Sequence, residues 1–439
     1  MAWHHGPVTA WPAVLTINPI NRASGAVRLP GSKSISNRVL LLSSLTDGET
    51  ALVSLLEADD ARVMGDSLTR LGIRMRRGDA ALYVRGCNGR FPVCEASLFL
   101  GNAGTAFRSL TAALAFSGGR YELDGVARMR ERPIGDLIDA LNSMGARIRS
   151  TGLPGFPPLL IEPADRVSTD RVSIKADVSS QFLSGLLMAA PLLAPDHGLR
   201  ISVEGRLISE PYVELTLSLM KQFDVSVGRA GNDFLVPRAP YRSPGRLVVE
   251  GDASSASYFL ALGAIAGALV RVDGVGRESV QGDVRFADVL ASMGVHVDFG
   301  VNHITASAPA KGRLRAIDAD CNHIPDAAMT LAIVALFADG PSTLRSVGSW
   351  RVKETDRISA MATELRKVGA EVDEGSDWIR ITPPTQFREA TIDTYDDHRM
   401  AMCFSLVAAG GVPVHIRNPG CVTKTFPDYF ERLAELVQQ

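Results

Sequence analysis

Residues 29–45 read LPGSKSISNRVLLLSSL, in which a short polar cluster opens a leucine-rich stretch. Serine before an apolar run is typical of a capped helix start. The arrangement recurs five times along the 439-residue chain, at intervals of 70–75 residues. The six starts are Ser34, Gly104, Ser179, Ala253, Asp326 and the segment from Thr394 to Asp397. A constant spacing of this length predicts six copies of one structural unit.

A second signal follows four of these helix starts by 38–43 residues, where a glycine precedes alternating apolar residues. The glycines are Gly72, Gly145, Gly294 and Gly369. The third copy, KQFDVSVGRAGNDFLV, lacks this glycine. Two helices followed by a hairpin-like pair of strands predict a repeated α/β unit.

Six units would overfill one core, so we expect two lobes of three units each. The turn sequence SPGR and the helix start GDASSAS mark one boundary, and Leu29-Pro30-Gly31 marks the other. We therefore predict one lobe from residues 1–30 and 248–439, a second from 31–247, and a hinge near 29–32 and 244–251. The early strands in VLTINPI and AVRLP are expected to complete the last unit.

Composition narrows the functional class. The chain is 46% hydrophobic and 21% charged, with a formal net charge of −2, which argues against a general binder of nucleic acid or membrane surfaces. Five cysteines without a CxxC pair indicate thiols in a reducing compartment. The sequence has no secretory leader pattern and no apolar run of membrane-spanning length, so we expect a cytoplasmic protein.

The N–H groups of a helix start are unpaired and can bind anions. The first three helix starts also carry side chains suited to binding an anion. In LPGSKSISNR, residues 33–38 alone hold two cations and two hydroxyls, more than capping needs. GNAGTAFR allows close backbone approach to a ligand, DVSSQF adds neutral hydrogen-bonding groups, and ARMRERPIG adds arginines that could equally be an exposed charged loop. The candidates here are Lys33, Ser34, Arg38, Gly104, Arg132, Ser179, Ser180 and Gln181.

The later motifs combine acids with further cations. In NHIPDAAM, Asp326 is either a ligand or a helix cap. In WRVKETDR, the spacing places Lys353 and Arg357 on one helical face beside Glu354, although an exposed salt-bridged helix is the alternative. YDDHRMAM adds Arg399, and TKTFPDYF adds Lys424. A histidine beside two aspartates lacks a second histidine at ligand spacing, so no metal site is expected.

Together these motifs predict a pocket for small, multiply anionic substrates. The start at Ala253 has no cation, and we interpret it as structural.

The motifs LPGSKSISNR, GNAGTAFR, RMRERPIG, VSSQF, SEPY, EGDASSASYF, NHIPDAAM, WRVKETDR, YDDHRMAM and KTFPDYF resemble, in order, those of the 5-enolpyruvylshikimate-3-phosphate synthase family. The resemblance implies an inside-out α/β arrangement of two lobes, whose helix N-termini face a shared cleft that closes on substrate. It implies transfer of the enolpyruvyl group from phosphoenolpyruvate to the 5-hydroxyl of shikimate 3-phosphate, with release of phosphate and no metal or organic cofactor. A monomer is expected.

The resemblance also implies residue roles. Shikimate 3-phosphate would be held by Lys33, Ser34, Arg38, Ser179, Ser180, Gln181, Ser209, Tyr212, Asp326, Ser349 and Lys353. Phosphoenolpyruvate would be held by Lys33, Gly104, Arg132, Gln181, Arg357, Arg399 and Lys424. Asp326 and Glu354 match the base and acid, with Lys33 beside the tetrahedral intermediate. Phe107, Ser109 and Ser349 depart from the usual Met, Pro and Asn.

Two alternatives remain. The sister transferase that acts on UDP-N-acetylglucosamine shares the repeats, but it places a reactive cysteine in the loop corresponding to ARMRERPIG. Here no cysteine lies between Cys94 and Cys321. A non-catalytic phosphoanion-binding protein would have no use for Asp326 and Glu354 as a paired base and acid.

Overall fold

The computed structural model describes residues 11–164, 167, 169–309 and 313–438. The chain divides into two compact units. One comprises Gly31–Val249, and the other comprises the segment that ends at Pro30 together with the chain from Glu250 onward.

The first unit contains three four-stranded sheets with the strand orders β15-β4-β6-β5, β7-β8-β10-β9 and β11-β12-β14-β13 in its described part. The helices are α1 (Lys33–Leu45), α2 (Asp59–Arg70), α3 (Gly104–Leu114), η1 (3₁₀, Ala127–Glu131), α4 (Gly135–Ser143), α5 (Ser180–Leu193) and α6 (Pro211–Gln222). The strands are β4 (Glu49–Val53), β5 (Arg74–Arg77), β6 (Ala81–Arg85), β7 (Glu95–Phe99), β8 (Arg120–Asp124), β9 (Arg147–Ser150), β10 (Leu159–Glu162), β11 (Arg171–Lys175), β12 (Leu199–Glu204), β13 (Gly228–Ala230), β14 (Asp233–Val236) and β15 (Arg246–Val248).

The second unit contains the sheets β17-β18-β16-β3, β19-β20-β22-β21 and β1-β24-β23, and the ladder β2-β25. Its α-helices are α7 (Ala253–Ile265), α8 (Phe286–Ser292), α9 (Ala328–Val334), α10 (Arg357–Lys367), α11 (His398–Ser405) and α12 (Tyr429–Leu436). Its 3₁₀ helices are η2 (Gly282–Arg285), η3 (Cys321–His323), η4 (Ala335–Phe337), η5 (Gly348–Val352), η6 (Leu406–Gly410) and η7 (Pro419–Lys424). Its strands are β1 (Val14–Ile17), β2 (Arg22–Ala23), β3 (Gly25–Arg28), β16 (Val270–Asp273), β17 (His296–Phe299), β18 (His303–Ser307), β19 (Asp318–Asp320), β20 (Ser342–Arg345), β21 (Glu371–Glu374), β22 (Trp378–Thr382), β23 (Ala390–Ile392), β24 (Val414–Arg417) and β25 (Val437–Gln438).

One pairing pattern recurs in these sheets. In the second copy β7 pairs with β8 in parallel, β8 pairs with β10 antiparallel, and β10 pairs with the edge strand β9 antiparallel. The sheets that contain β4, β12, β16 and β20 follow the same order of one parallel and two antiparallel pairs. The predicted repeated α/β unit is therefore confirmed, with two helices and a hairpin in each complete copy.

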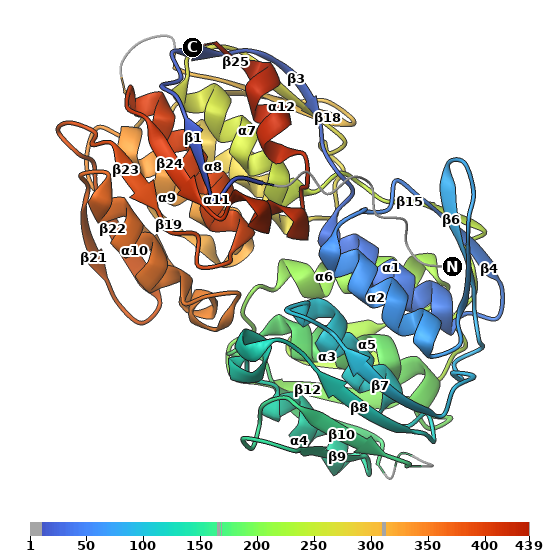
Figure 1. The fold of residues 1–439 in the computed structure, drawn as a ribbon. Helices are drawn as coiled ribbons and strands as arrows, with labels where there is room; N and C mark the ends of the chain where they lie inside the picture. The colour runs from blue at the N-terminus through green and yellow to red at the C-terminus, as the bar shows by residue number, and fades with distance from the viewer. Residues whose placement is uncertain (1–10, 165–166, 168, 310–312, 439) are drawn as a thin grey trace. The chain divides into compact units, whose positions relative to one another are not determined.

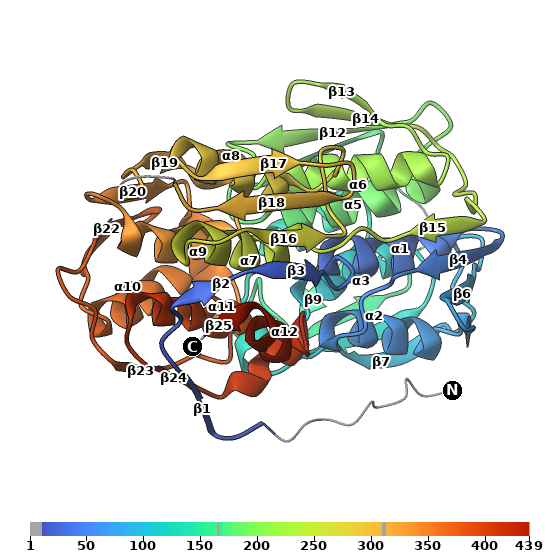
Figure 2. The same ribbon diagram turned by 90° about the horizontal axis from the view of Figure 1, so that it is seen from above.

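Two leading strands pair away from their neighbours in sequence. β3 precedes the first helix start but pairs with β16, and β15 precedes the fourth helix start but pairs with β4. Figure 2 shows β3 beside β16. β1, from VLTINPI, pairs with β24 and completes the last copy as predicted, whereas the AVRLP strand enters the sheet of the fourth copy.

The third copy forms its hairpin without the glycine. Gly72, Gly145, Gly294 and Gly369 all have φ between 92° and 103°, in the region that side chains rarely enter. Asp224 takes the equivalent position after α6 with φ 66°. Aspartate tolerates this left-handed conformation better than most residues, so the chain turns out of the helix in the same way.

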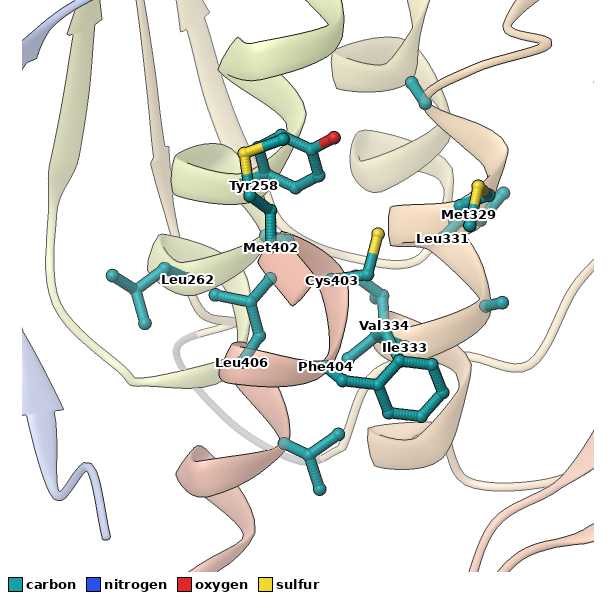
Figure 3. Packing of buried hydrophobic residues seen from close by; sticks show 14 of the residues in the cluster. Tyr258, Leu262, Met329, Leu331, Ile333, Val334, Met402, Cys403, Phe404 and Leu406 are labelled. Atoms are coloured by element: carbon teal, nitrogen blue, oxygen red, sulfur yellow. The ribbon is translucent and has the colours of Figure 1, made fainter. Parts of the chain in front are cut away.

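The first helix of each copy is buried. In the first unit α3 lies beside α5, and the strands β7 and β8 lie outside them (Figure 1). In the second unit side chains of α7, α9 and α11 pack together, including Leu262, Ile333 and Phe404 (Figure 3). Helices that are apolar on nearly every side must be enclosed, which places the sheets outside and gives the inside-out arrangement that the resemblance implied. Within the described ranges no helix combines the length and apolarity needed to cross a bilayer.

Candidate active site

In the second unit, the carboxylate of Asp326 is the meeting point of three cations. Its Oδ2 lies 2.8 Å from Nη2 of Arg399, and its Oδ1 lies 3.3 Å from Nη1 of Arg357 and 3.7 Å from Nζ of Lys353. The residue is 7% exposed. α9 has Ala327 at its N-cap, so Asp326 lies one residue before the capping position. Asp326 thus lies close to the start of α9 and is at the same time the partner of three cations.

Glu354 lies in the same cluster. Its Oε2 accepts a hydrogen bond from Nη2 of Arg357 at 2.8 Å, and its Oε1 lies 3.9 Å from Nζ of Lys424. Arg357 also contacts Asp397, so three carboxylates surround one buried guanidinium. Burial opposes the positive charge of Arg357, but these carboxylates outweigh it and raise its pKa above the ordinary value.

Lys353 and Arg357 do not lie on one helical face as the sequence predicted. Lys353 has extended backbone at the end of η5, and α10 begins at Arg357 after Asp356, whose side chain caps it by accepting from the N–H of Ser359. The chain therefore bends between the two cations. Both still reach Asp326, because the bend turns them toward the same carboxylate.

The turn before α11 holds Asp397 in place. Tyr395 and Asp396 have φ of 53° and 55°, an uncommon conformation for residues other than glycine. The Tyr395 hydroxyl donates to Oε1 of Glu364 at 2.7 Å, which anchors this turn to α10. Asp397 then caps α11 by accepting from the N–H of Arg399 at 2.9 Å. The strained turn thus positions the partner of Arg357 and directs Arg399 toward Asp326.

In the described part of the first unit, Arg38 is the least exposed cation, at 2%. Its Nε donates to Oγ1 of Thr216 at 2.8 Å, and its Nη1 donates to the carbonyl of Ser34 at 2.9 Å. Nη2 reaches Oγ of Ser184 and the carbonyl of Tyr212, each at 3.4 Å. Burial lowers the pKa of Arg38 to about 10. These contacts join α1, α5 and α6 around one guanidinium.

A second group forms at the start of α3. A Cβ at Gly104 would lie 2.6 Å from Nη2 of Arg132 and 2.7 Å from Nη1 of Arg108, so only glycine leaves room for both guanidiniums. Nη1 of Arg132 donates to Oδ1 of Asn102 at 3.0 Å. Nε2 of Gln181 donates to Oγ1 of Thr105 at 3.4 Å. The structure therefore brings Gly104, Arg132 and Gln181 to one helix start.

The remaining candidates lie on the same elements. The Lys33 ammonium is 3.8 Å from Oδ2 of Asp60, and Ser179 caps α5 by accepting from the N–H of Gln181. Ser34, Ser180, Ser209 and Tyr212 lie at or just before the starts of α1, α5 and α6. In the second unit, Ser349 lies half-buried on η5 and is not hydrogen-bonded to the described side chains around Asp326.

The buried charges around Arg357 are suited to proton transfer and to stabilising an anion. In the second unit three carboxylates (Asp326, Glu354 and Asp397) meet four cations (Lys353, Arg357, Arg399 and Lys424). Buried carboxylates held this way can exchange protons while the cations stabilise developing negative charge. Among the residues that the structure describes, no group of three or more His, Cys, Asp or Glu could hold a metal ion.

The family model for EPSP synthase (3-phosphoshikimate 1-carboxyvinyltransferase) matches residues 17–433. The chain belongs to the EPSP synthase family. It is 61% identical over 422 residues to a 3-phosphoshikimate 1-carboxyvinyltransferase of Thiobacillus denitrificans, covering 95% of this chain and 98% of that protein. It is 59% identical over 427 residues to the enzyme of the same name from Laribacter hongkongensis, covering 96% and 99%.

Solved structures agree with this membership in the EPSP synthase family. An EPSP synthase from Acinetobacter baumannii superposes with a TM-score of 0.79 at 25% identity, over 97% of this chain and 98% of that one. The enolpyruvyl transferase NikO from Streptomyces tendae has a TM-score of 0.74 at 20% identity, over 96% and 97%, and shares the fold.

Sequence reasoning missed partners that hold the EPSP synthase family motifs in place. Asp60 faces Lys33, Asn102 binds Arg132, and the Tyr258 hydroxyl accepts from Nη1 of Arg399 at 3.1 Å. Asp60 lies in the first turn of α2, where acidic residues are common. The sequence pattern therefore does not indicate that Asp60 pairs with Lys33. Asn102 lies inside the quoted GNAGTAFR motif and could have been proposed from it.

Proposed function

We propose that this chain transfers the enolpyruvyl group of phosphoenolpyruvate to the 5-hydroxyl of shikimate 3-phosphate and releases phosphate. The observation that carries the proposal is the pairing of Asp326 and Glu354 on one buried guanidinium, Arg357, in a chain that the family model matches over both units. Addition of the hydroxyl to the vinyl carbon needs a base for the hydroxyl proton and an acid for the methylene carbon. Asp326 is the base and Glu354 the acid in this proposal.

The binding roles divide between the two units. The first unit supplies Lys33, Ser34, Arg38, Ser179, Ser180, Gln181, Ser209 and Tyr212 to shikimate 3-phosphate, and the second supplies Asp326, Ser349 and Lys353. Phosphoenolpyruvate takes Lys33, Gly104, Arg132 and Gln181 from the first unit and Arg357, Arg399 and Lys424 from the second. The ion pairs of Arg357, Arg399 and Lys424 with carboxylates support this assignment, because they hold the cations in place before an anion arrives. Lys33 stabilises the tetrahedral intermediate.

The two units act as lobes in this proposal, with the hinge at residues 29–32 and 244–251. Its support is local: the N–H of Asp252 donates to the carbonyl of Pro30 at 2.9 Å, so the two connecting segments run together. We further propose a cytoplasmic monomer that needs no metal or organic cofactor. Sedimentation with and without substrates tests the monomer, and activity in the presence of a chelator tests whether a metal is needed.

One assay tests the function. Phosphate release from phosphoenolpyruvate is measured with shikimate 3-phosphate, with UDP-N-acetylglucosamine, or with no acceptor. We expect phosphate release only when shikimate 3-phosphate is the acceptor. Mass spectrometry should then detect the enolpyruvyl ether of shikimate 3-phosphate. Release only with the nucleotide sugar would point to the sister transferase. Binding of both anions without release would point to a non-catalytic phosphoanion-binding protein.

A further inference from the structure

The helix start at Ala253, which the sequence indicated to be purely structural, meets a buried carboxylate. Oγ of Ser254, in the first turn of α7, donates a short hydrogen bond to Oδ2 of Asp283 on η2. Asp283 is 4% exposed. The fourth copy of the repeat therefore contributes a polar contact in the interior of the second unit.

The other oxygen of Asp283 leads to Asp326. Oδ1 of Asp283 accepts from the backbone N–H of Ala327 at 3.5 Å, and Ala327 directly follows Asp326. Gln281 fixes the segment on its other side, since its Oε1 accepts from the N–H of Ala253 at 3.1 Å and its Nε2 donates to the carbonyl of Gly251 at 2.7 Å. Asp283 thus connects the start of α7 to the backbone that carries Asp326.

Asp283 also affects Asp326 through charge. Burial first, and the nearby Asp326 carboxylate second, raise the pKa of Asp283 to about 6. The Ser254 hydroxyl and Arg399 favour the ionised form, while Asp252 at the N-cap of α7 opposes it. Two buried carboxylates that influence each other in this way have linked proton affinities.

We propose that Asp283 is a positioning residue for Asp326, which steadies the backbone at Ala327 and places a second negative charge beside the Asp326 carboxylate. The inference rests on the proposed role of Asp326 as the base. A neighbouring negative charge increases the affinity of that base for the proton it removes from the substrate hydroxyl. The fourth repeat then serves the reaction without touching a substrate.

The test is the pH dependence of kcat in the Asp283→Asn variant of the full chain. Asparagine keeps an oxygen for the N–H of Ala327 and an amide for Ser254, so the substitution removes the charge and little else. We expect kcat at pH 7 to fall about tenfold, the KM of both substrates to stay within about twofold, and the acid limb of kcat to move to lower pH by about one unit. Asp288→Asn, at an exposed position of α8, is the matched control, with kcat and profile unchanged.

A second variant protects the test if Asp283→Asn does not fold. Ser254→Ala removes a donor that favours ionised Asp283, so less negative charge remains beside Asp326, and the acid limb moves the same way by a smaller amount. An acid limb that coincides with that of the unmodified chain in the folded variants would overturn the proposal. A joint loss of kcat and substrate affinity with no shift of the limb would also overturn it. An unmodified chain without transferase activity would instead overturn the proposed function, and the inference with it.

Discussion

Arg357 and Asp397 form a two-point ion pair in which Nε lies 2.7 Å from Oδ2 and Nη2 lies 3.2 Å from Oδ1. Their side chains are 1% and 0% exposed. Breaking a buried pair on one side leaves an uncompensated charge, which costs far more than the pair gains over an apolar contact. The pair therefore fixes the position of Arg357 in the folded chain. Arg357 in turn fixes the carboxylates of Asp326 and Glu354.

The first prediction is that Asp397→Asn lowers the free energy of unfolding by about 3 kcal/mol, because Arg357 loses its closest counter-charge. Asparagine still caps α11, so the loss reports the ion pair and not the cap. Asp356→Asn is the control, since Asp356 also caps a helix and pairs with an arginine, Arg351, but is 40% exposed. Urea denaturation should show at most about 1 kcal/mol for the control. Equal losses in the two variants would contradict the role of burial.

The second prediction concerns proton transfer. Glu354→Gln and Asp326→Asn should lower kcat by about 10²–10⁴-fold, while substrate dissociation constants change much less, because each removes a group proposed to transfer a proton and keeps the shape of the side chain. Glu374→Gln is a suitable control, because Glu374 on β21 pairs with Arg366 and lies outside the cluster around Arg357. The control should keep both its stability and its kcat. Weak binding with normal turnover in Glu354→Gln or Asp326→Asn would make those residues ligands only.

The sequence predicted helix starts better than strand partners, and the reason is physical. A helix start is a local event, set by a capping residue and the following apolar residues, as at Ser179 and Asp397. Strand pairing depends on segments far apart in the chain, so nothing within AVRLP indicates that β3 joins β16 and not the last copy. The hairpin of the third copy was not predicted from a glycine, because Asp224 adopts the positive φ that glycine has in four other copies.

In the candidate site, too, local features were predicted from the sequence and contacts between distant segments were not. Residues inside dense motifs, such as Arg357 and Lys424, were predicted, and the structure pairs both with Glu354. The bend between Lys353 and Arg357 was missed because a one-helix spacing rule ignores the cap at Asp356. Asp283 carries no local signal, since QGDVRF resembles any polar segment, and only the fold brings it to Ala327.

The third prediction concerns the guanidiniums at the start of α3. Gly104→Ala should raise the KM for phosphoenolpyruvate about tenfold or more, because the added methyl would lie under 3 Å from the ends of Arg132 and Arg108 and must displace them. Alanine favours the helix, so thermal stability should not fall. Steady-state kinetics with each substrate varied in turn checks this. In Gly152→Ala of the same unit the methyl meets Pro158 at an ordinary 3.5 Å, so its KM should be unchanged. An unchanged KM in Gly104→Ala would show that the arginines do not hold that substrate.

The last prediction is a dependence of stability on pH that arises from Asp283. Its pKa is raised to about 6 in the folded chain, against an ordinary value of 3.8, so the folded state binds the proton more tightly than the unfolded state. Its contribution to stability is complete below about pH 4 and is lost as the pH rises through 6. Asp283→Asn has no such loss. The variant should therefore gain stability relative to the unmodified chain between pH 4 and 7, by up to about 3 kcal/mol, and the difference should stay constant above pH 7. Urea denaturation at several pH values measures it. A difference that does not vary with pH would mean that Asp283 ionises as easily in the folded chain as in the unfolded one, and that the negative charge placed beside Asp326 costs the fold nothing.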